Sequence, residues 1–382
     1  VFGVEQDRVR VVARDVGGNF GTRNSIFPEF ILVTWAARRL GRPVKWTCDR
    51  SEAFASDYQG RDLVSDLELA LDKDGHILAL RATNTSNIGS HSISLVPLAK
   101  GIGIISGTYN IPVAHVRARG VLSNTPPTNP YRSAGRPETI FALERLVEKV
   151  AREMGLDPVE FRRRNMIDPA TMPYVNSTGM SYDSGNFEQN MDKAMALADW
   201  DGFAARKAKT QAKGLRRGLG IASYVETSTG FPRERSDMRV RPEGLVDVVI
   251  GTLSSGQGHE TSFSQVVAEK LGAPFEAVNL IQGDTDIVKA GGGSHSGRSM
   301  RMAGIVMVKA AAEIMDKGQR IAAHVLEAAE SDLEYSEGSF RVAGTDRALG
   351  LFEVAKAAET RDDLPEDLKG PLAATADETI RI

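Results

Sequence analysis

Three loops in the sequence combine glycine with small polar residues immediately ahead of an expected helix. They span residues 17–22, 256–261 and 291–299. A glycine loop that opens a helix exposes backbone N–H groups and the positive end of the helix dipole, and both attract an anion. One such loop is weak evidence, but the repeated design favours a large polar ligand that carries several phosphate or oxygen groups.

A fourth loop, residues 129–138, adds two cationic side chains to this design. Arg132 and Arg136 could each hold a phosphate or oxo group through two parallel hydrogen bonds. The structural alternative is a salt bridge from these arginines to Glu138 or Glu144 in the following helix. The sequence leaves both possibilities open.

The loop at residues 256–261 also offers a side chain that could recognise a heterocycle. Gln257 can donate and accept hydrogen bonds, so it could fix one edge of a polar ring. The alternative is a tight strand-to-helix turn with a solvated His259. On this stretch alone the two interpretations are equally supported.

Familiar nucleotide-binding and hydrolase motifs do not fit. Residues 17–22 are not followed by the Gly-Lys-Ser/Thr of a P-loop, and no Gly-x-Gly-x-x-Gly stands in a Rossmann context. Ser254 and Ser255 do not form a Gly-x-Ser-x-Gly elbow. Asp284 and Asp286 look like a carboxylate pair, but a turn capped by aspartate explains them more simply.

Composition excludes several further classes. A chain of 382 residues is long enough for two or three domains, and its formal net charge of -3 predicts no general attraction to nucleic acid. No apolar run is long enough to span a membrane. Cys48 is the only cysteine, which excludes an internal disulfide, a cysteine zinc site and an iron–sulfur cluster held by this chain. Because the six histidines show no metal-ligand spacing, any metal must arrive inside a cofactor.

Hydrophobic periodicity predicts a chain of mixed elements. Strands are expected at residues 9–16, 44–48, 113–122, 218–225 and 245–250, hairpins at residues 62–87 and 333–342, and helices at residues 28–40, 138–154, 158–164, 187–200, 263–271 and 301–329. Residues 245–250 and 274–282 resemble the two strands of a βαβ unit. The proline- and glycine-rich stretch 165–185 predicts a boundary between domains at residues 1–165 and 166–382.

Two further stretches leave alternatives open. The basic run at residues 206–217 is explained by a solvated linker or helix face, and a docking patch for a partner subunit is the sharper alternative. The chain begins at Val1 without methionine, and residues 374–382 look like a strand cut short. These features favour a fragment of a longer polypeptide over a natural end in a frayed strand.

The four loops in their order resemble one protein family. Residues 17–21, 131–136, 256–261 and 296–299 are similar to motifs of the molybdenum-binding large subunit of the xanthine dehydrogenase family. That family includes aldehyde oxidoreductases, carbon monoxide dehydrogenases and hydroxylases of aromatic N-heterocycles. The resemblance covers essentially the whole chain and implies an α+β fold of two mixed α/β molybdopterin-binding domains. It also implies molybdopterin cytosine dinucleotide as the cofactor, with no direct metal ligand from the protein.

The resemblance implies cofactor-binding roles for residues of all four loops. These residues are Gly18, Phe20, Gly21, Arg132, Gln257, Gly258, Ser296, Gly297, Arg298 and Ser299. Phe20 and Gly21 would lie beside the molybdenum ligands and Arg132 beside the metal's oxo groups. Gln257 and Gly258 would bind the pterin or its dinucleotide tail, and the last loop would hold phosphate and pterin groups.

Departures from the family patterns narrow the expected substrate. Carbon monoxide dehydrogenases carry a copper-binding cysteine where this chain has Ser133, so a copper–molybdenum site is not expected. Purine-oxidising members have an acidic residue near the position of Asn24 and an aromatic residue at that of Ala134. The resemblance therefore points to a small aldehyde or N-heteroaromatic substrate, oxidised with an oxygen from water.

The family's general base is a glutamate expected beyond Ile382, and a pterin-binding glutamine is expected before Val1. The piece alone is therefore expected to be inactive. The resemblance further implies iron–sulfur and FAD partner subunits, a dimer of heterotrimers and a cytoplasmic location. Two alternatives remain: a non-catalytic cofactor-binding or assembly subunit, and an enzyme that binds a nucleotide directly without metal.

Overall fold

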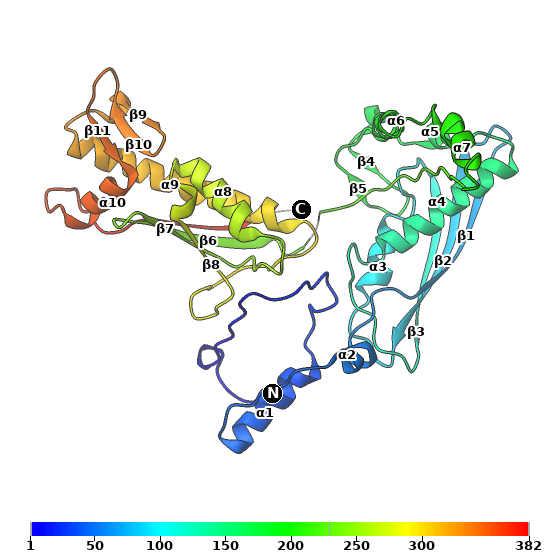
Figure 1. The fold of residues 1–382 in the computed structure, drawn as a ribbon, viewed down its shortest axis with the longest axis horizontal. Helices are drawn as coiled ribbons and strands as arrows, with labels where there is room; N and C mark the ends of the chain where they lie inside the picture. The colour runs from blue at the N-terminus through cyan, green and yellow to red at the C-terminus, as the bar shows by residue number, and fades with distance from the viewer. Residues whose placement is uncertain (1, 229, 381–382) are drawn as a thin grey trace. The chain divides into compact units, whose positions relative to one another are not determined.

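The computed structural model describes residues 2–228 and 230–380, which form two compact units (Figure 1). One unit combines Val1–Gly18 with Thr227–Ile382, and the other comprises Asn19–Glu226. The expected domain boundary after residue 165 concerns the family's domains and stays a prediction.

The unit Asn19–Glu226 is built on a three-stranded sheet in the order β1-β2-β3. The expected hairpin is confirmed, because β1 (Leu63–Leu71) and β2 (Ile77–Gly89) pair antiparallel around a turn with Gly75 at a φ of 84°. The expected strand at residues 113–122 is β3 (Val113–Leu122), which pairs parallel with β2. The register places Leu80 beside Ala114 and buries it in the core.

Helix α4 (Arg136–Glu153) supplies the apolar face that packs on this sheet. Its buried residues Leu143, Val147 and Ala151 recur at helical spacing, and they belong to the same core as Leu80 and Phe161. The remaining elements of the unit are α1 (Pro28–Leu40), α2 (Arg50–Ser56), α3 (Val96–Gly103), α5 (Pro158–Asn165), η2 (Pro169–Thr171), β4 (Tyr174–Val175), β5 (Ser181–Tyr182), α6 (Phe187–Leu197) and α7 (Phe203–Gln211). The bounds of α1 are those expected: Pro28 begins it, and Gly41, in the left-handed conformation, ends it.

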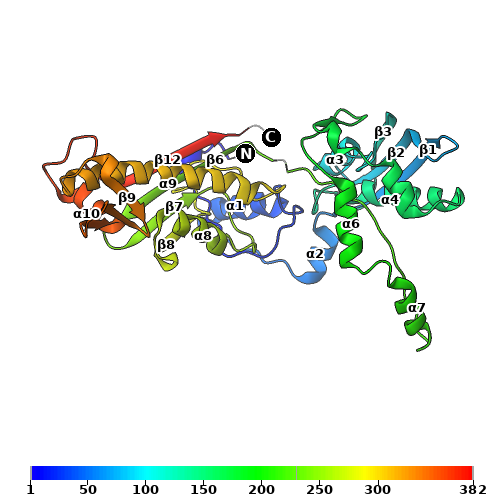
Figure 2. The same cartoon turned by 90° about the horizontal axis from the view of Figure 1, so that it is seen from above.

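The second unit contains a four-stranded sheet in the order β12-β6-β7-β8. β12 (Leu372–Thr379), β6 (Arg233–Arg241) and β7 (Leu245–Ile250) are antiparallel neighbours, and β8 (Val278–Ile281) is parallel to β7. Helix α8 (His259–Leu271) connects β7 to β8, which confirms the βαβ unit. The long helix α9 (Arg298–Val325) runs along β6 and β12 (Figure 2).

Buried residues of β6, β7, α8 and α9 form one core in this unit, with Val248, Phe263 and Met307 among them. The other elements are η1 (Gln6–Arg8), η3 (Phe275–Ala277), η4 (Glu330–Asp332), β9 (Leu333–Ser336), β10 (Ser339–Val342), β11 (Ala348–Gly350) and α10 (Leu351–Thr360). β9 and β10 confirm the expected hairpin at residues 333–342.

Three expected strands are wrong. Residues 44–48 and 218–225 contain no strand, and residues 9–16 make only one isolated antiparallel bridge, from Val12 to Asp284. Apolar β-branched residues favour extended backbone, but a strand also needs a neighbouring ladder, and these segments have none. Of the expected strand 374–382, the part up to Thr379 belongs to β12, and residues 381 and 382 lie outside the described residues.

Candidate functional site

The loop ahead of α4 has a backbone that L-residues rarely adopt. Arg132, Ser133, Ala134 and Gly135 have successive φ values of 23°, 68°, 45° and 92°. The left-handed region costs a residue with a Cβ roughly 1–2 kcal/mol, so the three non-glycine residues together cost on the order of 3–6 kcal/mol. Strain of this kind persists where surrounding contacts enforce it, and it is often found at functional sites.

Two glycines allow the close approaches that shape this loop. A Cβ on Gly135 would lie 1.6 Å from the carbonyl oxygen of Pro97, and one on Gly21 would lie 2.6 Å from that of Pro130. Both separations are far below van der Waals contact. Glycine is therefore required at Gly21 for the loop at residues 17–22 to reach the loop at residues 129–138.

Phe20, Gly21 and Arg132 are brought together at this approach. The Arg132 N–H donates to the Phe20 carbonyl oxygen at 2.8 Å, and the Arg132 guanidinium carbon lies 5.2 Å from the centroid of the Phe20 ring. Tyr131 meets the other side of Phe20 edge-on, with 6.3 Å between ring centroids. The exposed guanidinium of Arg132, for which the described residues show this ring contact and no ion pair, can accept an anionic ligand.

Arg136 has a different role from the one its sequence position suggested. Its side chain is buried and forms an ion pair with Glu226, not with Glu138 or Glu144 as the structural alternative expected. Glu138 instead lies 3.6 Å from the guanidinium of Arg61. The Arg136 guanidinium therefore stabilises the loop at residues 129–138 through its ion pair with Glu226 and is not available to a ligand.

In the other unit, two glycine loops precede α8 and α9. The first follows the carboxyl end of β7, beside its parallel neighbour β8, where open α/β sheets bind ligands. Gly258 and Gly297 are the N-caps of the two helices, with φ values of 74° and 73°, and no side chain caps either first turn. A Cβ on Gly256 or Gly258 would meet nothing within 4 Å. The Thr261 N–H of α8 and the Arg298 N–H of α9 bond to backbone carbonyls, at 3.1 Å and 3.0 Å. The other N–H groups of the two first turns remain available to an anion.

Close packing holds these two loops together. A Cβ on Gly251 would lie 2.4 Å from the Cα of Gly291, so the backbones touch. The Ser294 hydroxyl donates to the Leu253 carbonyl oxygen at 2.6 Å. The segments before α8 and α9 thus form one continuous backbone surface.

A buried ion pair stabilises the two loops before α8 and α9. Arg298 and Glu234 are fully buried, with 2.8 Å between guanidinium and carboxylate. Glu234 also accepts from the Thr252 hydroxyl at 2.6 Å and the Gly292 N–H at 3.3 Å. Arg298 further donates to the Gly293 carbonyl at 2.5 Å, so its guanidinium is engaged within the protein and its role is to support the loop.

Glu234 was missed from the sequence because it stands in the highly charged run 233–241, which looks exposed. The available signal was the strand period of two, which places Glu234 on the same face as the buried Met238 and Val240. Gln282 was also missed. It accepts from the Ser254 N–H at 2.9 Å and donates to a Glu260 carboxylate oxygen at 2.6 Å.

Gln257 and His259 behave in opposite ways. Gln257 is exposed, and its Oε1 accepts from the Ser255 N–H at 2.5 Å, which leaves the amide nitrogen directed to donate elsewhere. His259 is 3% exposed, so the solvated ring of the alternative interpretation is wrong. Its Nδ1 lies 3.0 Å from the Thr252 carbonyl oxygen and its ring stacks on Phe263. Burial lowers the pKa of His259 below its usual value.

The carboxylates at residues 284–286 form a turn, as the simpler interpretation predicted. Asp284 accepts from the Asp286 N–H at 3.0 Å and pairs with Arg10 at 2.5 Å. The hydrogen bonds from Arg10 and from the Asp286 backbone hold the pKa of Asp284 at about 2. Asp284 thus ties the N-terminal segment to this unit.

Within residues 2–228 and 230–380, no cluster of three or more histidine, cysteine, aspartate or glutamate side chains is placed to hold a metal ion. In the same part of the chain, no helix has both the length and the apolar character needed to cross a membrane.

Comparison with known proteins identifies both halves of the chain. Residues 1–166 and residues 193–377 each match a model of a molybdopterin cofactor-binding domain. The chain is 35% identical over 375 residues to the 6-hydroxypseudooxynicotine dehydrogenase complex subunit gamma of Paenarthrobacter nicotinovorans, which covers 96% of this chain and 47% of that protein.

Solved structures agree. A crystal structure of a Cu,Mo-CO dehydrogenase in its carbon monoxide reduced state aligns with a TM-score of 0.86 and 32% identity, covering 99% of this chain and 50% of that chain. Quinoline 2-oxidoreductase from Pseudomonas putida 86 aligns with a TM-score of 0.86 and 31% identity, covering 97% and 49%. The chain spans about half the length of these relatives.

The fold and both sets of loops thus define a protein with two molybdopterin cofactor-binding domains. The chain belongs to the molybdopterin-binding large subunits of the xanthine dehydrogenase, aldehyde oxidase and carbon monoxide dehydrogenase family.

Proposed function

We propose that this chain is the cofactor-binding part of a molybdenum hydroxylase, which oxidises an aldehyde or an N-heteroaromatic carbon with an oxygen derived from water. The observation that carries the proposal is the pair of glycine-capped helix starts, α8 and α9, whose first turns no side chain caps. Backbone N–H groups at such positions bind phosphate. The family membership supplies the cofactor whose phosphates they fit.

The residues present fit a molybdopterin dinucleotide by their chemistry. Open backbone at Gly256 and Gly258 leaves room for a ligand to approach, and the amide of Gln257 can donate to a polar ring or a phosphate. The exposed guanidinium of Arg132, packed on Phe20, suits an anionic oxygen. When bound, the molybdenum cofactor would supply the oxygen transfer and accept two electrons from the substrate.

We assign cofactor contacts to the residues that the sequence singled out, with one change of role. The assigned residues are Gly18, Phe20, Gly21, Arg132, Gln257, Gly258, Ser296, Gly297 and Ser299. Arg298 contributes through the support that its side chain gives to the loop at residues 291–299. The general base remains a glutamate predicted beyond Ile382.

Ser133 supports an organic substrate over carbon monoxide. The solved relative named as a Cu,Mo-CO dehydrogenase carries copper by its name, and a serine hydroxyl is a poor ligand for that soft metal. In this chain the Ser133 hydroxyl donates to Glu226. Two relatives are named for quinoline and for 6-hydroxypseudooxynicotine, so an N-heteroaromatic substrate is the class that we favour.

The cytosine dinucleotide form, the iron–sulfur and FAD partner subunits, the dimer of heterotrimers and the cytoplasmic location remain predictions. Electrons from the substrate need an acceptor chain, and Cys48 alone cannot hold a cluster. The relative from Paenarthrobacter nicotinovorans is itself a subunit of a complex, which supports the expectation of partners.

Content analysis of the full-length protein, purified with its partners, tests the proposal. We expect equal amounts of molybdenum, pterin and cytidine monophosphate after acid release, together with turnover of quinoline or an aromatic aldehyde. Cofactor without turnover of any aldehyde or heteroaromatic compound would favour the non-catalytic assembly subunit. Bound nucleotide without molybdenum or pterin would contradict the proposal and favour direct nucleotide binding.

A further inference from the structure

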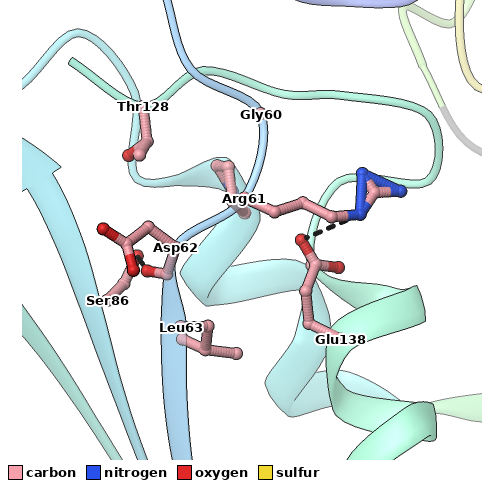
Figure 3. Close-up of a pocket in the computed structure, with 9 residues that line it drawn as sticks. Gly60, Arg61, Asp62, Leu63, Ser86, Thr128 and Glu138 are labelled. Atoms are coloured by element: carbon pink, nitrogen blue, oxygen red, sulfur yellow. Dashed lines mark hydrogen bonds and ion pairs between the residues drawn. The ribbon is translucent and has the colours of Figure 1, made fainter. Parts of the chain in front are cut away.

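The left-handed loop at residues 132–135 is held from two sides by side chains that no expected role accounts for. On one side stands Arg61, next to a small cavity between β1, α3 and the start of α4 (Figure 3). On the other side stands Glu226. Both residues lie in the unit Asn19–Glu226.

Arg61 binds the loop through its carbonyl groups. Its guanidinium donates to the carbonyl oxygens of Tyr131 at 3.2 Å and Arg132 at 2.8 Å, and it lies 4.8 Å from the centroid of the Tyr131 ring. Figure 3 shows the same side chain reaching Glu138, at 3.6 Å. Two carbonyls and a carboxylate are thus bound by one planar fork, a geometry that lysine cannot reproduce.

The close fit at Gly60 places Arg61 where it can make these bonds. A Cβ on Gly60 would lie 2.9 Å from the Cβ of Tyr131, so only glycine lets the two segments run together here. The backbone beside Gly60 is tied to the loop at residues 129–138, because the Asn129 N–H donates to the Gln59 carbonyl oxygen at 2.9 Å. Arg61 is thereby held against the loop before its side chain bonds.

Glu226 binds the loop at its middle and at its end. Its carboxylate accepts from the Ser133 hydroxyl and from the Arg136 guanidinium, and from the Tyr224 hydroxyl at 3.0 Å. Arg136 is 3% exposed, and a buried guanidinium that lost its carboxylate would be strongly destabilised. Glu226 therefore couples the burial of Arg136 to the conformation of Ser133.

We propose that Arg61 and Glu226 are positioning residues, which hold residues 132–135 in the left-handed conformation and so fix the Arg132 guanidinium over the Phe20 ring. Without them the loop would relax to backbone conformations that residues with a Cβ prefer. The binding of a cofactor by Arg132 rests on the proposed function. The role of Arg61 and Glu226 in the loop conformation does not depend on that proposal.

Amide hydrogen exchange in the full-length chain tests the clamp. The reporters are the Arg132 N–H, bonded to the Phe20 carbonyl, and the Ala134 N–H, bonded to the Tyr131 carbonyl at 2.9 Å. We expect Arg61→Gln and Glu226→Gln each to accelerate exchange in the peptide covering these amides at least about tenfold, because loop opening then breaks fewer bonds. Arg61→Lys is expected to resemble Arg61→Gln, since a single ammonium cannot bridge both carbonyls.

The matched control is Arg81→Gln, which removes an arginine from the exposed pair with Glu68 in the same unit. It should leave exchange in the loop unchanged. In the Arg61→Gln background, Ala134→Gly should slow exchange again, because glycine adopts a positive φ without a Cβ clash. A general loss of stability would instead accelerate exchange in peptides outside the loop as well.

Wild-type exchange in the Arg61 and Glu226 variants would overturn the clamp, as would equal acceleration by Arg81→Gln. Molybdenum content distinguishes the clamp by Arg61 and Glu226 from the proposed contact of Arg132 with the cofactor. Accelerated exchange with a loss of molybdenum supports both the clamp and the role of Arg132. Accelerated exchange with full molybdenum content supports the clamp and contradicts the assignment of Arg132 to the cofactor.

Discussion

His259 begins α8 but turns its ring into the core, where it stacks on Phe263 with 4.3 Å between centroids. Its Nδ1 bonds to the Thr252 carbonyl, which links the first turn of α8 to the loop after β7. Because the ring is buried, the neutral form is favoured and the pKa lies below 6.5. The unfolded chain therefore binds more protons than the folded chain just below that pH.

Stability should fall as the pH drops below about 6.5, with a component that belongs to His259. The stabilisation is fully present above the unfolded pKa and is lost as the pH falls toward the lower folded pKa. Urea denaturation at several pH values from 7.5 to 5 measures it in wild type and in His259→Gln, which keeps a donor for Thr252 but does not titrate. Identical pH slopes in the two proteins would show that His259 contributes nothing.

Single residues also show where sequence reasoning succeeds. Glycine loops were expected ahead of the helices at residues 263–271 and 301–329, and in the structure Gly258 and Gly297 are the N-caps, in the left-handed conformation. Anion binding there stays a prediction. The partner of Arg136 could not be predicted, because Glu226 lies 90 residues away. Local spacing predicts a helix start well, but a long-range ion pair depends on how distant segments pack.

Among the secondary-structure elements, the alternation of apolar and polar residues and the turn residues predicted most of the helices and strands. The hairpin β1–β2 and the unit β7–α8–β8 follow from period-two apolar residues and glycine turns. Residues 9–16 failed as a strand because period alone does not show whether a neighbouring strand is available. The close contact of the loops at Gly251 and Gly291 was likewise outside local reasoning.

The pair Arg298–Glu234 joins α9 to β6, and its loss should loosen both glycine loops. Arg298→Met would leave the Glu234 carboxylate buried without its countercharge, which costs about 3–5 kcal/mol. Urea denaturation should show a loss of this size. The double variant Arg298→Met with Glu234→Leu should recover part of it, because no unpaired charge remains.

Arg320→Gln is the matched control for this experiment. It breaks an ion pair with Asp367 whose side chains are 45% and 58% exposed. Exposed pairs contribute about 0–1 kcal/mol, so only a small change is expected. Equal losses in Arg298→Met and Arg320→Gln would mean that the buried pair has no special structural role.

At the scale of the whole molecule, cofactor-binding candidates are divided between the two compact units. Phe20 and Arg132 lie in Asn19–Glu226, whereas Gln257 and Ser299 belong to the unit that contains Thr227–Ile382. The two family-model matches, residues 1–166 and 193–377, divide the chain at a different place from these units. The sequence motifs predicted that cofactor-binding residues come from distant parts of the chain. They could do so because the order of the loops along the chain does not depend on how the units pack.

We propose that the glycine loop at residues 256–261 holds the cofactor through its backbone and through Gln257. Its most direct test is the molybdenum and pterin content of the full-length complex carrying Gln257→Ala, compared with Gln265→Ala. Gln265 is an exposed glutamine on α8, the helix that follows this loop, and its loss controls for the substitution itself. We predict that Gln257→Ala lowers cofactor content at least about fivefold, the effect of one lost hydrogen bond to a charged or polar group, and that Gln265→Ala retains wild-type content. Equal cofactor content in wild type and both variants would contradict a role for Gln257 in cofactor binding.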